Sequence, residues 1–202
     1  MRRWFFSFIL LLCPLLSWAD PDAMNQVLRQ KPVLENFKIC HAGGCEAVET
    51  TGLSNDEWET IADLFQVAPE TAEDERGLIS LAIGLFETYV GVKTNTANDL
   101  GGTFSGFMVP GQLDCNDEAI NSTTYMKLLT QAGFLKFHHV IDTKRRGYFL
   151  NRWPHSTAAI EDNATGEQFA VDSWFYDNGS PAVIIPLEQW KNGWKPSDGP
   201  SL

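Results

Sequence analysis

The chain has 202 residues, and its 26 acidic against 15 basic side chains give a formal net charge of -11. Such a surface repels phosphate backbones, and the run at 144–146 is the only basic cluster and fits a solvated turn, so nucleic acid is excluded as the expected partner. A chain of this length and 44% hydrophobic content can bury one sizeable core, which predicts a single domain.

Residues 1–19 are expected to be an export signal. Two arginines follow the first methionine, residues 4–18 are mostly apolar, and residues 17–19 match a small-x-small cleavage site. The apolar stretch is too short to predict a membrane span. We therefore expect one mature domain over residues 20–202, located in the periplasm or secreted.

The hydrophobic period changes from helical to extended along the chain. Three helices are predicted, over residues 54–65, from Pro69 onward, and from about Cys115 to Gln131. Five short β-prone segments follow, separated by turn residues: 134–141, 147–150, 156–161, 167–173 and 182–186. Helices first and an antiparallel sheet afterwards predict an α+β fold.

The cysteines beyond the signal are odd in number. Cys40 and Cys45 are separated by a loop that contains two glycines, and in an oxidising compartment we expect them to form a local disulfide. A metal site that adds His41 is the alternative, although a single run without a second ligand pair is weak evidence. Cys115 then remains unpaired, either as a small buried apolar residue or as a nucleophile.

Cys115 is expected at the start of its helix. The unpaired N–H groups and the dipole there favour a thiolate, which predicts a lowered thiol pKa. Asp114, Asp117 and Glu118 carry negative charges at the same place and oppose thiolate formation. A nearby imidazolium is therefore needed to offset them.

His155 and Asp172 lie at the edges of two predicted strands that flank a turn. They face each other only if the strand register puts them on one face, which the sequence does not fix. Thiol, imidazole and carboxylate in this order suggest a nucleophile, its base and an orienting group. His138 and His139 are rival bases on one strand, where one faces the core and the other solvent. A turn cap is the structural alternative for Asp172.

These motifs resemble a known family. An Asp–Cys pair at a helix start, then Pro-His-x-x-x-Ala-Ile, then Phe-Ala-Val-Asp-x-Trp are similar to the transglutaminase-like branch of papain-fold cysteine hydrolases. Over residues 111–176 the chain resembles the periplasmic bacterial transglutaminase-like cysteine proteinases. The resemblance implies a papain-like fold in which Cys115 is the nucleophile, His155 the base and Asp172 the orienting residue.

The resemblance also implies two further roles. Gln112 lies upstream of the cysteine, where papain-type enzymes place the glutamine of the oxyanion hole. Asp114 is a calcium candidate, although Asn116 stands where the family carries a second acidic residue that helps to hold calcium. Otherwise no metal and no cofactor are expected.

The leading hypothesis is an exported thiol hydrolase that acts on a protein or peptide substrate. Cys115 would attack a peptide or amide carbonyl and form an acyl-enzyme. Transfer of the acyl group to an amine uses the same residues. The alternative is a non-catalytic papain-like binding or accessory protein of the cell envelope, in which Cys115 is unreactive.

Overall fold

The computed structural model describes residues 21–103, 109–147 and 154–196. Their elements follow in the order α1 (Pro21–Arg29), β1 (Phe37–His41), β2 (Ala47–Thr51), α2 (Asn55–Asp63), α3 (Ala72–Thr94), α4 (Cys115–Gln131), β3 (His138–Arg146), β4 (His155–Asp162), β5 (Gln168–Asp172), β6 (Val183–Pro186) and α5 (Leu187–Lys191). The strands of this part of the chain form an antiparallel hairpin, β1–β2, and an antiparallel sheet in the order β3–β4–β5–β6. The predicted α+β class is confirmed.

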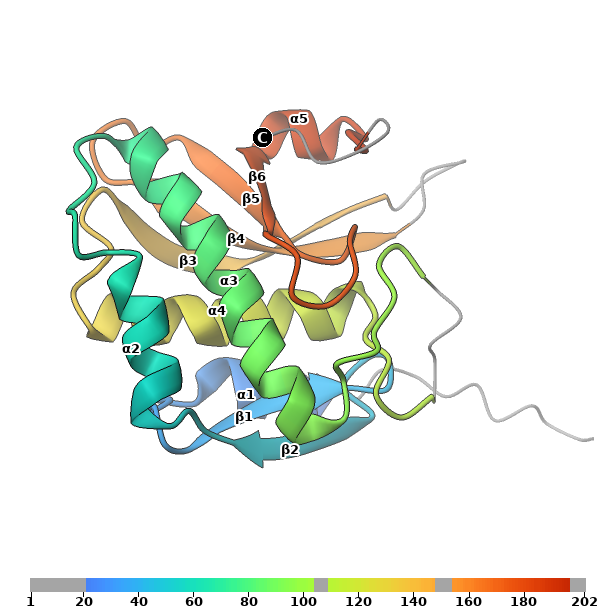
Figure 1. The fold of residues 1–202 in the computed structure, drawn as a ribbon. Helices are drawn as coiled ribbons and strands as arrows, with labels where there is room; N and C mark the ends of the chain where they lie inside the picture. Colours follow the sequence, from blue (N-terminus) through green and yellow to red (C-terminus); the bar gives the residue numbers. More distant parts are fainter. Residues whose placement is uncertain (1–20, 104–108, 148–153, 197–202) are drawn as a thin grey trace, which may run out of the picture.

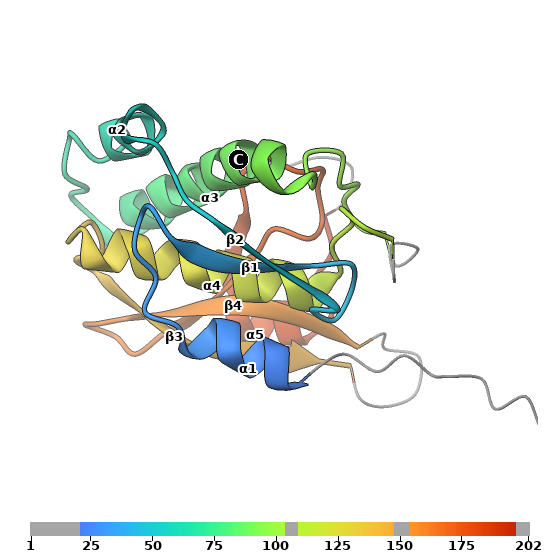
Figure 2. The same cartoon turned by 90° about the horizontal axis from the view of Figure 1, so that it is seen from below.

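Helix α4 lies between the hairpin and the four-stranded sheet, with α3 packed across it (Figure 1). Helix α5 covers the opposite face of the sheet, and α1 lies against α4 and β1 (Figure 2). Because α4 has neighbours on most sides, its apolar residues Tyr125, Met126 and Leu129 are fully buried. Tyr125 stacks on Phe86 of α3 with ring centroids 4.8 Å apart.

Local capping signals determine where the helices begin. A capping box at Ser54 starts α2, which ends at Asp63, two residues before the predicted end. The predicted bounds of α4 are confirmed. The expectation for Pro69 is wrong, because α3 begins only at Ala72. Thr71 exchanges hydrogen bonds with Asp74 there, and such a reciprocal cap satisfies the first N–H groups of a helix, which Pro69 cannot do.

Strands β4, β5 and β6 occupy the predicted segments, but β3 differs. It runs from His138 to Arg146, with a register shift between Ile141 and Lys144. The basic residues 144–146 therefore lie in a strand and not in the expected turn. Of the strand predicted at 147–150, all but the first residue lie outside the described residues.

In the part of the chain that the structure describes, no helix is long and apolar enough to cross a membrane. The expected export signal, residues 1–19, lies outside that part.

Candidate active site

The fold brings His155 and Asp172 into direct contact. The pairing of Ala158 with Val171 between β4 and β5 puts both side chains on the same face of the sheet. Nε2 of His155 lies 2.7 Å from Oδ2 of Asp172, and both side chains are buried. A carboxylate only accepts hydrogen bonds, so Nε2 carries the proton. Asp172 thus orients an imidazole instead of capping a turn.

Asp172 receives a second donor from the C-terminal helix. Nε1 of Trp190, on α5, lies 2.6 Å from the same Oδ2 atom. The rings of Trp174, Phe175 and Trp190 surround the His155 imidazole at centroid distances of 4.7, 5.3 and 5.4 Å. This apolar cover keeps water away, and hydrogen bonds are electrostatically stronger where the local dielectric is low.

Arg146, at the end of β3, holds α5 against the His155–Asp172 pair, which we call the dyad. Its guanidinium lies over the ring of Trp190, 4.5 Å from the centroid, and Nη1 donates to the carbonyl oxygens of Trp190 and Trp194. Sequence reasoning missed the role of Trp190. The available signal was chemical, because a buried indole N–H needs an acceptor.

Cys115 is the first residue of α4, and it is free and buried. The backbone of Ser156 and the charge of Asp172 both act on the pKa of this thiol, which places it near the strand that carries His155. Nδ1 of His155 is buried and has no hydrogen-bond partner among the described residues. The structure therefore brings the three candidates to one region, without a hydrogen bond between the thiol and the imidazole.

The expectation of a lowered thiol pKa is wrong. Burial raises the pKa of Cys115 to about 12, and the charges of Asp114 and Asp172 add to the effect. The helix start does not compensate, because Oδ1 of Asp114 already accepts the N–H groups of Asn116 at 2.8 Å and Asp117 at 2.9 Å. A carboxylate cap thus uses the donors that would stabilise a thiolate.

The calcium and oxyanion candidates have other partners. The second oxygen of Asp114 accepts from the Asn116 amide at 3.1 Å, so the carboxylate serves as a helix cap. Among the described residues no group of three or more His, Cys, Asp or Glu side chains is placed to hold a metal. The Gln112 amide donates to the carbonyl of Asn98 at 3.0 Å and accepts from the N–H of Leu100 at 3.5 Å, so loop backbone engages it.

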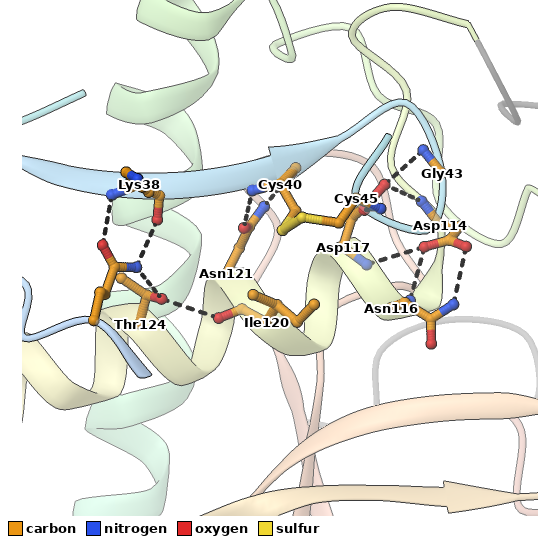
Figure 3. Close-up of a disulfide and its surroundings, with 11 residues drawn as sticks. Lys38, Cys40, Gly43, Cys45, Asp114, Asn116, Asp117, Ile120, Asn121 and Thr124 are labelled. Atoms are coloured by element: carbon orange, nitrogen blue, oxygen red, sulfur yellow. Dashed lines mark hydrogen bonds between the residues drawn. A yellow bond between two sulfur atoms is a disulfide. The ribbon is translucent and has the colours of Figure 1, made fainter. Parts of the chain in front are cut away.

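The expected disulfide between Cys40 and Cys45 is present. Its loop is hydrogen-bonded to the first turns of α4 (Figure 3). The carboxylate of Asp117 accepts from the N–H groups of Gly43 at 2.8 Å and Cys45 at 2.7 Å. One turn further, the Asn121 amide exchanges two hydrogen bonds of 2.8 Å with the backbone of Cys40. The hairpin is therefore fixed to the helix that carries the candidate nucleophile.

The loop aims its N–H groups at Asp117 by an unusual backbone. Residues 42–45 all have φ between 62° and 80°, a left-handed region that Gly43 and Gly44 adopt without a steric penalty. Successive N–H groups in such turns converge on an anion. Burial and the neighbouring Asp114 raise the pKa of Asp117 to about 8, although its backbone donors act in the opposite direction.

A buried acid pair lies behind the dyad, and sequence reasoning missed it. Oε2 of Glu118, on α4, accepts from Ser173 Oγ at 2.5 Å, and Ser173 directly follows Asp172. Glu87, on α3, lies close to Glu118, and its own carboxylate accepts from Gly179 N at 3.1 Å. Burial raises the pKa of Glu87 to about 8 and that of Glu118 well above its usual range. The pair therefore retains protons at neutral pH, which allows two acids to share an apolar interior.

The rival histidines lie at the far end of the sheet. His138 is paired with Asp162, whereas His155 is paired with Arg146 at the other end of the same two strands. His138 is buried and bonded to Glu75 at 2.9 Å, and His139 is exposed. The predicted alternation of the two faces is confirmed.

Comparison with known proteins returns no relative for this arrangement. No protein-family model matches the chain. No curated protein and no solved structure matches it either.

Proposed function

We propose that this chain is an exported thiol hydrolase of papain-like, transglutaminase-like fold that acts on a peptide or amide bond. Cys115 is the nucleophile, His155 the general base and Asp172 the orienting residue. One observation carries the proposal: the buried imidazole is held at Nε2 by Asp172, Nδ1 has no partner among the described residues, and the thiol lies near Ser156, the next residue along the strand.

The raised thiol pKa determines the mechanism. The resting thiol is protonated, and Nδ1 of His155 can accept its proton when Nε2 carries the ring's only proton and donates it to Asp172. Nδ1 takes the thiol proton as the sulfur attacks the carbonyl carbon, and Asp172 stabilises the imidazolium that forms. The imidazolium then protonates the leaving amine as the C–N bond breaks. Water attacks the acyl-enzyme and releases the acid and the free thiol.

The disulfide supports the proposed export. Disulfides form and persist in oxidising compartments, and the Cys40–Cys45 bond fits the periplasm or the exterior of the cell. We propose the same location for the acyl chemistry, with a protein or peptide as substrate.

A binding or accessory protein is the second candidate. It is favoured by the burial and raised pKa of Cys115, because such a thiol is ordinarily unreactive. In that case the dyad of His155 and Asp172 would be a structural hydrogen bond.

The pH dependence of Cys115 alkylation separates the two candidates. If His155 accepts its proton, the Cys115 thiol should be alkylated at neutral pH, at a rate that rises as the imidazole loses its proton. His155→Ala should abolish this rise in the alkylation rate. His139→Ala is the matched control, because this exposed residue lies away from the dyad. A rate that rises only at strongly alkaline pH, equally in all variants, would establish the accessory protein.

A further inference from the structure

A groove runs along the outer edge of β3, between that strand and helices α1 and α4. Its larger part has a volume of about 870 Å³ and is bordered by residues 139–143 of β3. Side chains of a strand alternate between two faces, so five consecutive lining residues show that the groove follows the edge of the strand and not one face.

This edge has no strand beside it in the described chain. β3 is terminal in the order β3–β4–β5–β6, and its register shift between Ile141 and Lys144 lies in the same stretch. The unpaired N–H and C=O groups of an edge strand are a template for another extended chain. Helices α1 and α4 form the facing wall through Asn25 and Lys127.

The groove ends near the start of α4, the helix that begins with Cys115. A cavity of about 100 Å³ continues from it, and Leu28 and Thr143 line both parts. Its wall includes Asn116 and Ser156, which follow Cys115 and His155 in the sequence and are joined by a hydrogen bond of 2.8 Å.

The walls of that cavity indicate what it accepts. Met24, Ala119 and Ile120 supply its apolar lining. A cavity of about 150 Å³ holds benzene, so this smaller one suits a small aliphatic side chain.

The charge of the groove is opposite to that of the molecule. Arg29, Lys127 and Arg145 line its two parts, and Asp142 is the single acid among the lining residues. The whole chain carries a formal net charge of -11. Positive charge concentrated beside an unpaired strand edge is complementary to an extended acidic chain.

We infer that this groove binds the substrate as an extended acidic peptide, which adds as a strand beside β3 and leads toward Cys115. A small aliphatic side chain of that peptide occupies the cavity next to Asn116 and Ser156. This inference rests on the proposed function, since it takes the occupant to be the substrate of Cys115. Two other occupants would contradict it: the segment that precedes α1, and the β3 edge of a second copy.

Binding to the Cys115→Ala variant of the mature chain tests the inference without turnover. The probes are fluorescein-labelled decapeptides that alternate Val with Glu or Val with Lys, followed by fluorescence anisotropy. The acidic peptide should bind and the basic one should not. Arg29→Gln and Arg145→Gln, both at exposed positions, should each weaken binding about threefold, and together roughly tenfold, as expected for exposed charge pairs. Lys191→Gln, on α5, is the charge-matched control and should bind like the parent.

The backbone of the probe tests strand addition without altering the protein. N-methylation of every second peptide N–H should abolish binding in one register and spare it in the other, because alternate residues of an added strand face the edge. Equal effects in both registers, or equal binding of acidic and basic peptides, overturn the inference. Loss of binding in a chain that retains residues 1–19, or a dimer that dissociates as the peptide is added, assigns the groove to one of the other occupants and overturns the inference too.

The outcomes also separate this inference from the proposed function. If the acidic peptide binds with these dependences but the unaltered chain never cleaves it, the thiol hydrolase proposal fails and the groove remains a peptide site. If Cys115 alkylation depends on His155 but peptide binding lacks charge and register dependence, only the groove inference fails.

Discussion

The two halves of the candidate site are built in opposite ways. His155 and Asp172 lie under Trp174, Phe175 and Trp190, a dry setting in which the hydrogen bond between them is already formed. Cys115 instead begins a helix crowded with carboxylates, and its pKa is raised to about 12. The contrast teaches that the His155–Asp172 pair is preformed whereas the thiol is held protonated. Under the proposed function, the imidazole must therefore activate the thiol.

Removal of the base should have the largest effect. A positioned general base contributes about 10²–10⁴-fold to a rate, so His155→Ala should reduce hydrolysis of a peptide substrate by at least about a hundredfold. Asp172→Asn should cost less, because the imidazole remains. Glu59→Ala, at an exposed position of α2, should leave kcat/KM unchanged in the same assay. A loss in Glu59→Ala that equals the loss in His155→Ala would show that the effect is not specific to His155.

Loss of the disulfide between Cys40 and Cys45 should have the next largest effect. The double variant Cys40→Ser, Cys45→Ser removes a bond that closes a short loop, worth about 2 kcal/mol of unfolding free energy. Urea unfolding checks this value. The near-ultraviolet circular dichroism of the tryptophans around His155 should stay unchanged, because the hairpin lies on the other side of α4. A changed tryptophan signal would mean that the two halves are not independent.

Loss of one donor to Asp172 should have a moderate effect. Trp190→Phe keeps a ring but removes the Nε1–H that reaches Oδ2. A hydrogen bond to a charged group is worth roughly 1.5–3 kcal/mol, and we expect kcat to fall about tenfold, with a shifted alkaline limb of the pH profile and little change in KM. Trp58→Phe is the control, because Trp58 stacks on Phe134 away from the dyad. Equal losses in both variants would indicate general destabilisation.

The buried acids should give the smallest effect, one of stability against pH. The pKa of Glu87 is raised from 4.5 to about 8, so its contribution to stability is fully present below pH 4.5 and is lost as pH rises through about 8. Thermal unfolding should therefore occur at lower temperature at pH 8.5 than at pH 5.5. Glu87→Gln should reduce that difference, because a glutamine has no carboxyl group to lose its proton between these pH values. An unchanged pH dependence in Glu87→Gln would remove Glu87 from the explanation.

Local signals made parts of the fold predictable. The helical spacing of apolar residues after Cys115 predicted α4, whose bounds are Cys115–Gln131. The strand at residues 144–146 was missed because a basic run resembles an exposed turn, and only pairing with β4 makes it a strand. Helix α1 and the β1–β2 hairpin were not predicted, because their segments are short and the disulfide loop dominated the interpretation.

The candidate site, like the fold, was predictable only where a local pattern indicated it. The order of thiol, imidazole and carboxylate pointed to the dyad, but its face depended on a register that the sequence does not contain. The contacts of Asp117 with Cys45 and of Trp190 with Asp172 join residues far apart or on different elements, so no local pattern carries them. The thiol pKa was mispredicted for a similar reason, since burial is a property of the packed chain.

The position of Trp190 constrains the order in which the site can assemble. Asp172 is held from one side by His155 and from the other by a helix that lies well after it in the sequence. A chain that emerges or is translocated N-terminus first exposes Cys115 long before α5 follows. A product that stops before Leu187 would carry the thiol and the imidazole but lack the indole that fixes the carboxylate. The last helix therefore completes the hydrogen bonding of Asp172 only after the rest of the site has been made.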